Sequence, residues 1–126
     1  KGECDNALGY YGKALKIQFK TLGAEHPFVG TTYNNIATSY LKKGEYDNAL
    51  GYYGKALKIE FKTLGAEHPD VGVTYNNIGS AYHKKGDKKK ALAYLLKAKA
   101  ILLKKLGAQH PNTKIAQSTI DTINNE

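Results

Sequence analysis

Apolar residues recur along this chain with the period of amphipathic helices. Within residues 31–43, Tyr33, Ile36, Ala37 and Tyr40 are spaced i, i+3, i+4 and i+7, which places them on one helix face. The same period continues through most of the sequence, and the intervening positions are polar. The pattern predicts an all-α chain with six helices, over residues 5–21, 28–42, 47–64, 70–84, 88–106 and 112–124.

Glycine, proline and aspartate stand where helix ends are expected. Pro69 fits the first turn of a helix, where its missing N–H is not needed. Gly44 interrupts the apolar period, Asp47 is the predicted N-cap of the next helix, and Gly65 is its predicted left-handed stop. Successive helices are therefore predicted to pair as hairpins. Helix A denotes the first helix of a pair and helix B the second.

The chain consists of three copies of one unit. Shifting the sequence by 42 positions aligns the first unit with the second at 34 of 42 identities, whereas the third unit keeps 15 of 42. Such a period is typical of a helical repeat array, in which each unit buries its apolar faces against its neighbours. We predict one array with units 1–42, 43–84 and 85–126, the last a diverged C-terminal cap.

Glycine also occurs inside the predicted helices. Gly51 and Gly54 each cost roughly 1 kcal/mol relative to alanine in a helix interior. At about 100° per residue, both fall opposite the apolar face that carries Tyr53 and Ala56. We expect them on the outer surface, with their cost offset by packing on the other face. The alternative is that they admit a close-packing partner.

The spacing within a unit resembles the tetratricopeptide pattern Trp-x-x-Leu-Gly-x-x-Tyr followed by Ala-x-x-x-Phe. The matching residues are Tyr33, Ile36, Ala37 and Tyr40 in helix A, then Ala49, Tyr53 and Ala56 in helix B. The string LGAEHPDVGVTYNNIGSAY closely resembles the 42-residue repeats of kinesin light chain and similar arrays. The resemblance implies a tetratricopeptide-like α-solenoid of antiparallel helix pairs that forms a right-handed superhelix.

The polar side of helix A is the candidate binding surface, in an arc opposite the packed face. The resemblance implies that helix A lines a concave groove, with these residues on its floor. Asparagine amides suit the main chain of an extended peptide, and lysines favour acidic segments. Alternatively, the asparagines link adjacent repeats or face water. The candidate groove residues are Thr31, Asn34, Asn35, Thr38 and Lys42, then Val73, Asn76, Asn77, Ser80 and Lys84.

Catalytic and metal chemistry find no support in the sequence. No nucleophile, base and orienting group stand at convergent positions, and no phosphate-binding loop is present. His26, His68 and His110 are one repeat apart, too distant to share a metal ion. Each His-Pro pair is instead predicted to order the turn into helix A. We expect no enzyme activity, no cofactor and no metal.

The net charge of +8 raises nucleic acid as a rival partner. All 19 basic residues are lysine, whereas bidentate recognition of bases and phosphates favours arginine. We therefore expect at most weak, sequence-blind binding to nucleic acid. No apolar run is long enough to span a membrane, and we expect a cytoplasmic protein of which this sequence is a segment.

The two ends of the array differ in character. The last helix carries the apolar stripe Ala116, Ile120 and Ile123 and is otherwise polar, which suits a cap. The first helix B has no helix A before it in the sequence, so Tyr10 and Tyr11, with Ala14, are expected to be partly bare and to promote self-association. The sequence thus predicts a scaffold that binds an extended or short helical peptide. The alternative is a structural spacer or self-assembling array without a dedicated ligand.

Overall fold

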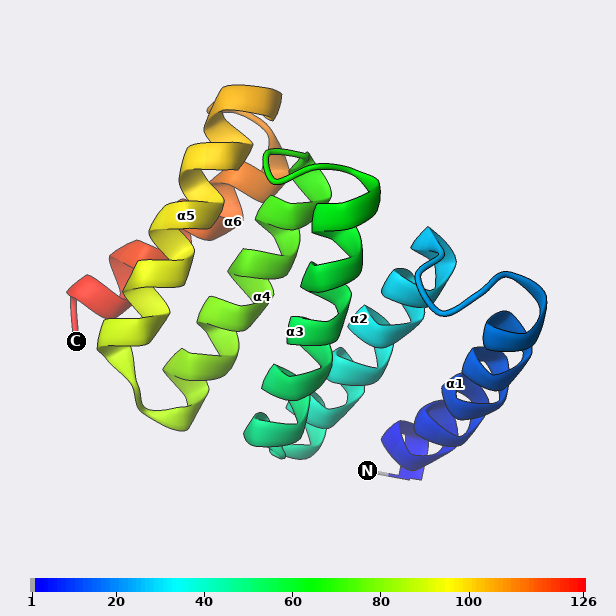
Figure 1. The fold of residues 1–126 in the computed structure, drawn as a ribbon. Helices are drawn as coiled ribbons and strands as arrows, with labels where there is room; N and C mark the ends of the chain where they lie inside the picture. The colour runs from blue at the N-terminus through cyan, green and yellow to red at the C-terminus, as the bar shows by residue number, and fades with distance from the viewer. Residues whose placement is uncertain (1) are drawn as a thin grey trace. The chain divides into compact units, whose positions relative to one another are not determined.

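The computed structural model describes residues 2–126 and is all-helical over that range (Figure 1). It comprises two compact units, which differ from the 42-residue repeats. The first ends at Thr63 and the second runs over Leu64–Glu126. The first unit contains α1 (Gly2–Thr21), α2 (Pro27–Lys43) and α3 (Tyr46–Thr63); the second contains α4 (Pro69–Lys85), α5 (Lys88–Leu106) and α6 (Pro111–Asn124). All six predicted helices are confirmed, with ends that differ by at most three residues from the predicted ones.

In the first unit, α2 lies between α1 and α3 and contacts both (Figure 1). Val29, Ile36 and Ala37 of α2 are buried, as are Tyr53 and Ala56 of α3. The apolar stripe predicted from the spacing therefore faces the neighbouring helices, and its burial stabilises helices whose intrinsic propensity is modest.

In the second unit, α5 contacts both α4 and α6. One apolar cluster joins Ala91 and Leu95 of α5 to Ile120 and Ile123 of α6. A second cluster joins Ala98 and Leu102 of α5 to Ala116 of α6. The predicted stripe of the last helix is confirmed as its packed face. On the other side of α6, Ser118 and Asn124 are exposed, whereas Gln117 and Thr119 are half-buried.

A histidine immediately precedes each helix A and is its N-cap. The Nδ1 atoms of His26, His68 and His110 accept hydrogen bonds from the backbone N–H two residues further on, at 3.0–3.1 Å. Each histidine is extended, and the following proline occupies the first helical turn. The prediction that each His-Pro pair orders this turn is confirmed, and the imidazole itself is the N-cap.

The other predicted helix ends are confirmed except for one. Gly44 and Gly65 are left-handed, with φ of 83° and 93°, which glycine adopts without a steric penalty. The prediction that Asp47 caps α3 is wrong, because α3 begins at Tyr46 and Asp47 lies in its first turn. The cap position belongs instead to the residue before Tyr46; its equivalent in the next unit, Asp87, accepts a hydrogen bond from the Lys90 N–H at 3.0 Å.

The glycines inside α3 lie on the outer surface, as predicted. A Cβ atom built on Gly51 or Gly54 meets no atom within 4 Å. The two buried glycines of α4 differ: a Cβ on Gly72 would lie 2.9 Å from Leu102 Cγ, and one on Gly79 would lie 2.6 Å from Leu95 Cγ. Glycine is therefore required where α4 meets α5, and is open to replacement in α3.

Helix α1 packs on one side only. None of its described residues is fully buried, and Tyr10 and Ile17 are 71% and 64% exposed. Tyr11 and Ala14 are half-buried. The predicted bare face of the first helix B is confirmed. In α3, the other helix B of this unit, the equivalent residues Tyr52 and Ile59 pack against α2, which is a helix A.

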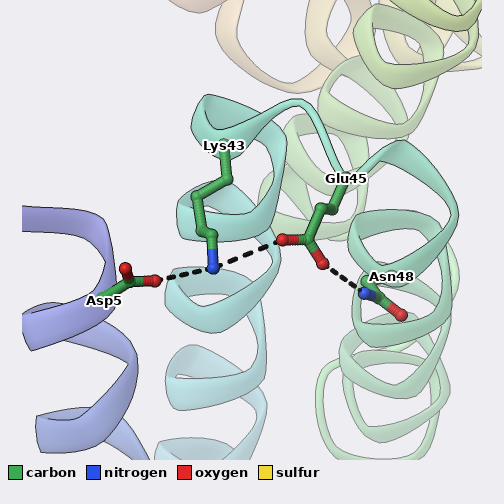
Figure 2. A network of polar contacts seen from close by, with 4 residues as sticks. All are labelled: Asp5, Lys43, Glu45 and Asn48. Atoms are coloured by element: carbon green, nitrogen blue, oxygen red, sulfur yellow. Dashed lines mark hydrogen bonds and ion pairs between the residues drawn. The ribbon is translucent and has the colours of Figure 1, made fainter. Parts of the chain in front are cut away.

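A polar network joins the three helices of the first unit near one end (Figure 2). Lys43 Nζ lies 2.6 Å from Asp5 Oδ1 of α1 and 3.3 Å from Glu45 Oε2 in the turn before α3. The Asn48 amide donates to Glu45 Oε1 at 2.8 Å. The hydrogen bond to Asp5, followed by that to Glu45, raises the pKa of Lys43. Lys43 therefore links α1 to the α2–α3 hairpin.

Candidate functional site

The candidate surface of α2 is narrower than the sequence predicted. Thr31, Asn35 and Lys42 are exposed on one side of the helix. Asn34 and Thr38 are half-buried and bonded to α3, so they lie at its edge and not opposite the packed face. The physical reason is that α2 packs on two helices, so its packed arc is wider than the apolar stripe alone indicates.

Two side-chain hydrogen bonds hold this edge of α2 on α3. Asn34 Nδ2 donates to Glu60 Oε2 at 3.2 Å, and Thr38 Oγ1 lies 2.8 Å from the Tyr53 hydroxyl. Burial raises the pKa of Tyr53, although the Thr38 hydrogen bond opposes that shift. The phenol stays neutral at physiological pH. These contacts fix the position of helix A and leave the Asn35 amide with no hydrogen-bond partner among the described residues.

In the second unit, most of the corresponding residues of α4 are half-buried. They are Val73, Asn76, Asn77 and Ser80, whereas Lys84 is exposed. Val73 packs against the cluster of Ala98, Leu102 and Ala116, so it contributes to the core. Asn77, like Asn35, has no side-chain hydrogen bond with the described residues.

Asn76 shows how one substitution changes the site. Its Oδ1 atom is buried without a hydrogen-bond partner among the described residues. Asn34, the equivalent residue of the first unit, bonds to Glu60, but the residue equivalent to Glu60 is Leu102. The substitution removes the carboxylate that accepts a hydrogen bond from this amide in the first unit.

Sequence reasoning missed a tyrosine ladder between helix A and helix B of each unit. In the first unit, the Tyr52 ring stacks on Tyr40 at 5.6 Å and lies 5.9 Å from Tyr33. Lys55 Nζ lies over both Tyr33 and Tyr52, at 5.5 and 4.9 Å from the ring centroids. Burial, followed by the neighbouring Tyr52, raises the pKa of Tyr33. The recurrence of Tyr52 as Tyr94 was the available signal.

The second unit repeats this ladder with the same geometry. The Tyr94 ring stacks on Tyr82 at 5.6 Å and lies 5.8 Å from Tyr75, and Lys97 lies over Tyr75 and Tyr94. The pKa of Tyr75 is raised by burial and then by Tyr94. These lysines are held on aromatic faces, so they belong to the scaffold and not to the candidate surface.

Within residues 2–126, no group of three or more histidine, cysteine, aspartate or glutamate side chains could hold a metal ion. Over the same residues, no helix is both long and apolar enough to span a bilayer. The exposed and half-buried side chains of α2 and of α4 carry amide, hydroxyl and ammonium groups.

Comparison with known families decides the classification. The family model described as Tetratricopeptide repeat matches residues 1–60 and 32–104. The chain belongs to the tetratricopeptide repeat family. Members of this family are generally non-catalytic scaffolds for protein interactions, so this tetratricopeptide chain is a protein-interaction scaffold in that general sense. No protein with a curated description matches the chain.

Solved structures agree with the family. The nearly identical TPR-like repeats of a candidate kinesin light chain from Podosopora anserina are 27% identical with a TM-score of 0.84, over 97% of this chain and 58% of that one. A point variant of the same protein gives 27% and 0.84, over 97% and 57%. BtubC (BKLC) from P. vanneervenii is 24% identical with a TM-score of 0.80, over 98% and 56%, and shows the fold alone. This tetratricopeptide chain thus spans just over half the length of these proteins.

Proposed function

We propose that the A helices bind an extended or short helical segment of a partner protein through their polar faces. The observation that carries the proposal is the pair of equivalent amides, Asn35 and Asn77, which are left without side-chain hydrogen bonds although the neighbouring Asn34 is bonded. An amide provides two donors and an acceptor, which match the main chain of a peptide and do not require a particular side chain.

Two exposed lysines on the A helices indicate the charge of the peptide that binds there. Lys42 and Lys84 are exposed at equivalent positions near the ends of α2 and α4, and neither has an ion-pair partner among the described residues. Acidic peptides are therefore the preferred ligands. Because exposed charges are screened by salt, this preference should weaken as ionic strength rises.

An array of acidic 12-residue peptides, with lysine-substituted copies as controls, tests the proposal directly. The best acidic peptide should bind the unmodified chain, and Asn35→Ala with Asn77→Ala should weaken it by about tenfold, as expected for two lost hydrogen bonds. Asn6→Ala is the matched control, because Asn6 is an exposed asparagine on α1, a helix B. If the double substitution leaves the affinity intact, the A helices do not form the binding face.

The bare face of α1 favours a second candidate function, self-association. Tyr10 and Ile17 are exposed, whereas α2 covers the equivalent Tyr52 and Ile59. We propose that a second copy of the chain covers this face through its own α1. Sedimentation equilibrium should give a mass above 13.8 kDa that Ile17→Lys returns to 13.8 kDa. A monomeric mass for the unmodified chain at high concentration would exclude this candidate.

A further inference from the structure

An apolar stripe runs along the side of α5 that faces away from its neighbours. The stripe consists of Ala93, Leu96, Ala100 and Leu103, which are all exposed, Leu96 by 55% and Leu103 by 44%. At about 100° per residue, it lies roughly opposite the buried residues through which α5 packs on the rest of the unit. The contacts of α5 with α4 and α6 therefore leave this outward face uncovered by the described residues (Figure 1).

The stripe is specific to the third repeat. Both earlier repeats have glycine, glycine and lysine where the third has Ala93, Leu96 and Ala100. Leu96 remains exposed, so this change adds apolar surface and gains the fold little burial. The equivalent residues are Gly9, Gly12 and Lys16 in α1, and Gly51, Gly54 and Lys58 in α3.

Positive charge surrounds the stripe. Helix α5 carries seven lysines and no acidic residue, whereas α3 carries three lysines and two acidic residues. Lys89 lies in line with the stripe near the start of the helix, Lys99 lies along one edge and Lys104 along the other. Neither Lys89 nor Lys99 forms an ion pair with the described residues. Lys104 lies 3.2 Å from Glu67, but both side chains are largely exposed, so water screens this pair.

The first turn of α5 shows that this charge does not serve the stability of the helix. Lys88, Lys89 and Lys90 occupy that turn, which has no acidic residue. The positive end of the helix dipole lies there, so each lysine costs the helix some stability. The first turn of α3 contains Asp47 instead. An anionic partner at the outward face of α5 would offset this cost.

We propose that the outward face of α5 binds the surface of a lipid bilayer that contains anionic phospholipids. Leu96 and Leu103 enter the boundary between the headgroups and the acyl chains, and the lysines contact lipid phosphate and carboxylate groups. The aliphatic stems of lysine allow the ammonium groups to stay at headgroup level while the leucines lie deeper. The helix lies in the plane of the bilayer and does not span it.

The composition of the stripe favours lipid over nucleic acid. Nucleic acid offers the lysines negative charge, but the leucines would remain in water. The stripe also has no aromatic side chain on which bases could stack. A bilayer satisfies the leucines and the lysines together. Because α5 is a helix B, this face is separate from the polar faces of the A helices.

Flotation of the chain with lipid vesicles tests the proposal. Vesicles of equal parts phosphatidylcholine and phosphatidylserine should carry the chain upward through a sucrose gradient, and vesicles of phosphatidylcholine alone should bind it at least about tenfold more weakly. Asn35→Ala with Asn77→Ala should leave vesicle binding unchanged, because these amides lie on A helices. No flotation with the anionic vesicles, or equal binding to both kinds of vesicle, would overturn the proposal.

Replacing the two leucines separates lipid from other anionic partners. Leu96→Gln with Leu103→Gln keeps the charge and the helix propensity, and should keep the fold because both side chains are exposed. This variant should bind anionic vesicles about tenfold more weakly, since the apolar contact is lost. A DNA duplex of random sequence should bind more weakly than the vesicles. Unchanged vesicle binding by the variant, or tighter binding of DNA than of vesicles, would overturn the proposal.

Two pairs of lysine substitutions separate the outward face from the net charge. Lys89→Gln with Lys99→Gln should weaken binding to anionic vesicles by about tenfold. Lys16→Gln with Lys58→Gln is the matched control, because it removes the same charge from exposed positions of α1 and α3. The control should change the affinity by less than about twofold. An equal loss in the two pairs would show that net charge alone drives binding, and would overturn the proposal.

Discussion

Replacing Gly51 and Gly54 with alanine is expected to stabilise the first unit. A Cβ atom at either position meets nothing within 4 Å, so the substitution introduces no clash. Each change should contribute about 0.5–1 kcal/mol, because alanine restricts the unfolded chain and favours the helix. Since the two positions share no packing partner, the pair should add to roughly 1–2 kcal/mol.

Gly79→Ala is the matched test in which the same chemical change should destabilise. The new Cβ would lie 2.6 Å from Leu95 Cγ and 3.1 Å from the Ala91 carbonyl oxygen. Overpacking of this kind costs about 1–3 kcal/mol, which exceeds or cancels the gain of about 1 kcal/mol in helix propensity. The expected net loss is up to about 2 kcal/mol.

The first unit suggests how Gly79→Ala could be rescued. Ala37 occupies the equivalent position there and is fully buried, and the residue equivalent to Leu95 is Tyr53. Combining Gly79→Ala with Leu95→Tyr recreates that pair and should recover part of the lost stability.

Urea unfolding followed by circular dichroism at 222 nm measures all of these variants. If the dependence of the unfolding free energy on urea concentration is unchanged, the urea midpoint should rise for the variant with both Gly51→Ala and Gly54→Ala. It should fall for Gly79→Ala. A lower midpoint for the pair, or a higher one for Gly79→Ala, would refute the account of which glycines the packing requires.

Three further changes test other parts of the structure. His68→Ala removes the Nδ1 acceptor that caps α4 and should lower stability by about 1 kcal/mol, measured by urea unfolding; an unchanged midpoint would exclude the cap. Lys43→Met breaks the contact with Asp5 and should speed hydrogen exchange in α1, with α5 of the second unit as the internal control. The hydrogen bonds of His83, and then of Lys88, lower the pKa of Glu126. These bonds therefore stabilise the fold above the usual glutamate pKa, and this contribution is lost as pH falls through the lowered pKa. Glu126→Gln should remove this acid sensitivity of α6, which NMR titration can follow between pH 6 and 3.

The helices were predictable because their apolar residues recur at helical spacing and because the unit repeats. Tyr53, Ala56 and Ile36 were identified as packed residues on spacing alone, and all three are buried. Asp47 was misassigned as an N-cap because capping depends on where the first helical hydrogen bond forms, and the sequence locates that position only to within a residue or two.

The candidate surface was harder to predict than the fold. Asn34 and Asn35 are adjacent and chemically identical, yet one is bonded to α3 and the other is exposed. That difference arises from the way α2 packs against two helices, which a single helical wheel does not represent.

The most direct test of the central claim follows the side-chain amide resonances of Asn35 and Asn77 by ¹⁵N NMR while an acidic peptide selected from the array is added. If the A helices are binding faces, the Asn35 amide and the Asn77 amide each shift in a saturable way, and the Asn34 amide, already bonded to Glu60, shifts less. If the peptide saturates while the Asn35 and Asn77 amides remain unmoved, the claim is contradicted.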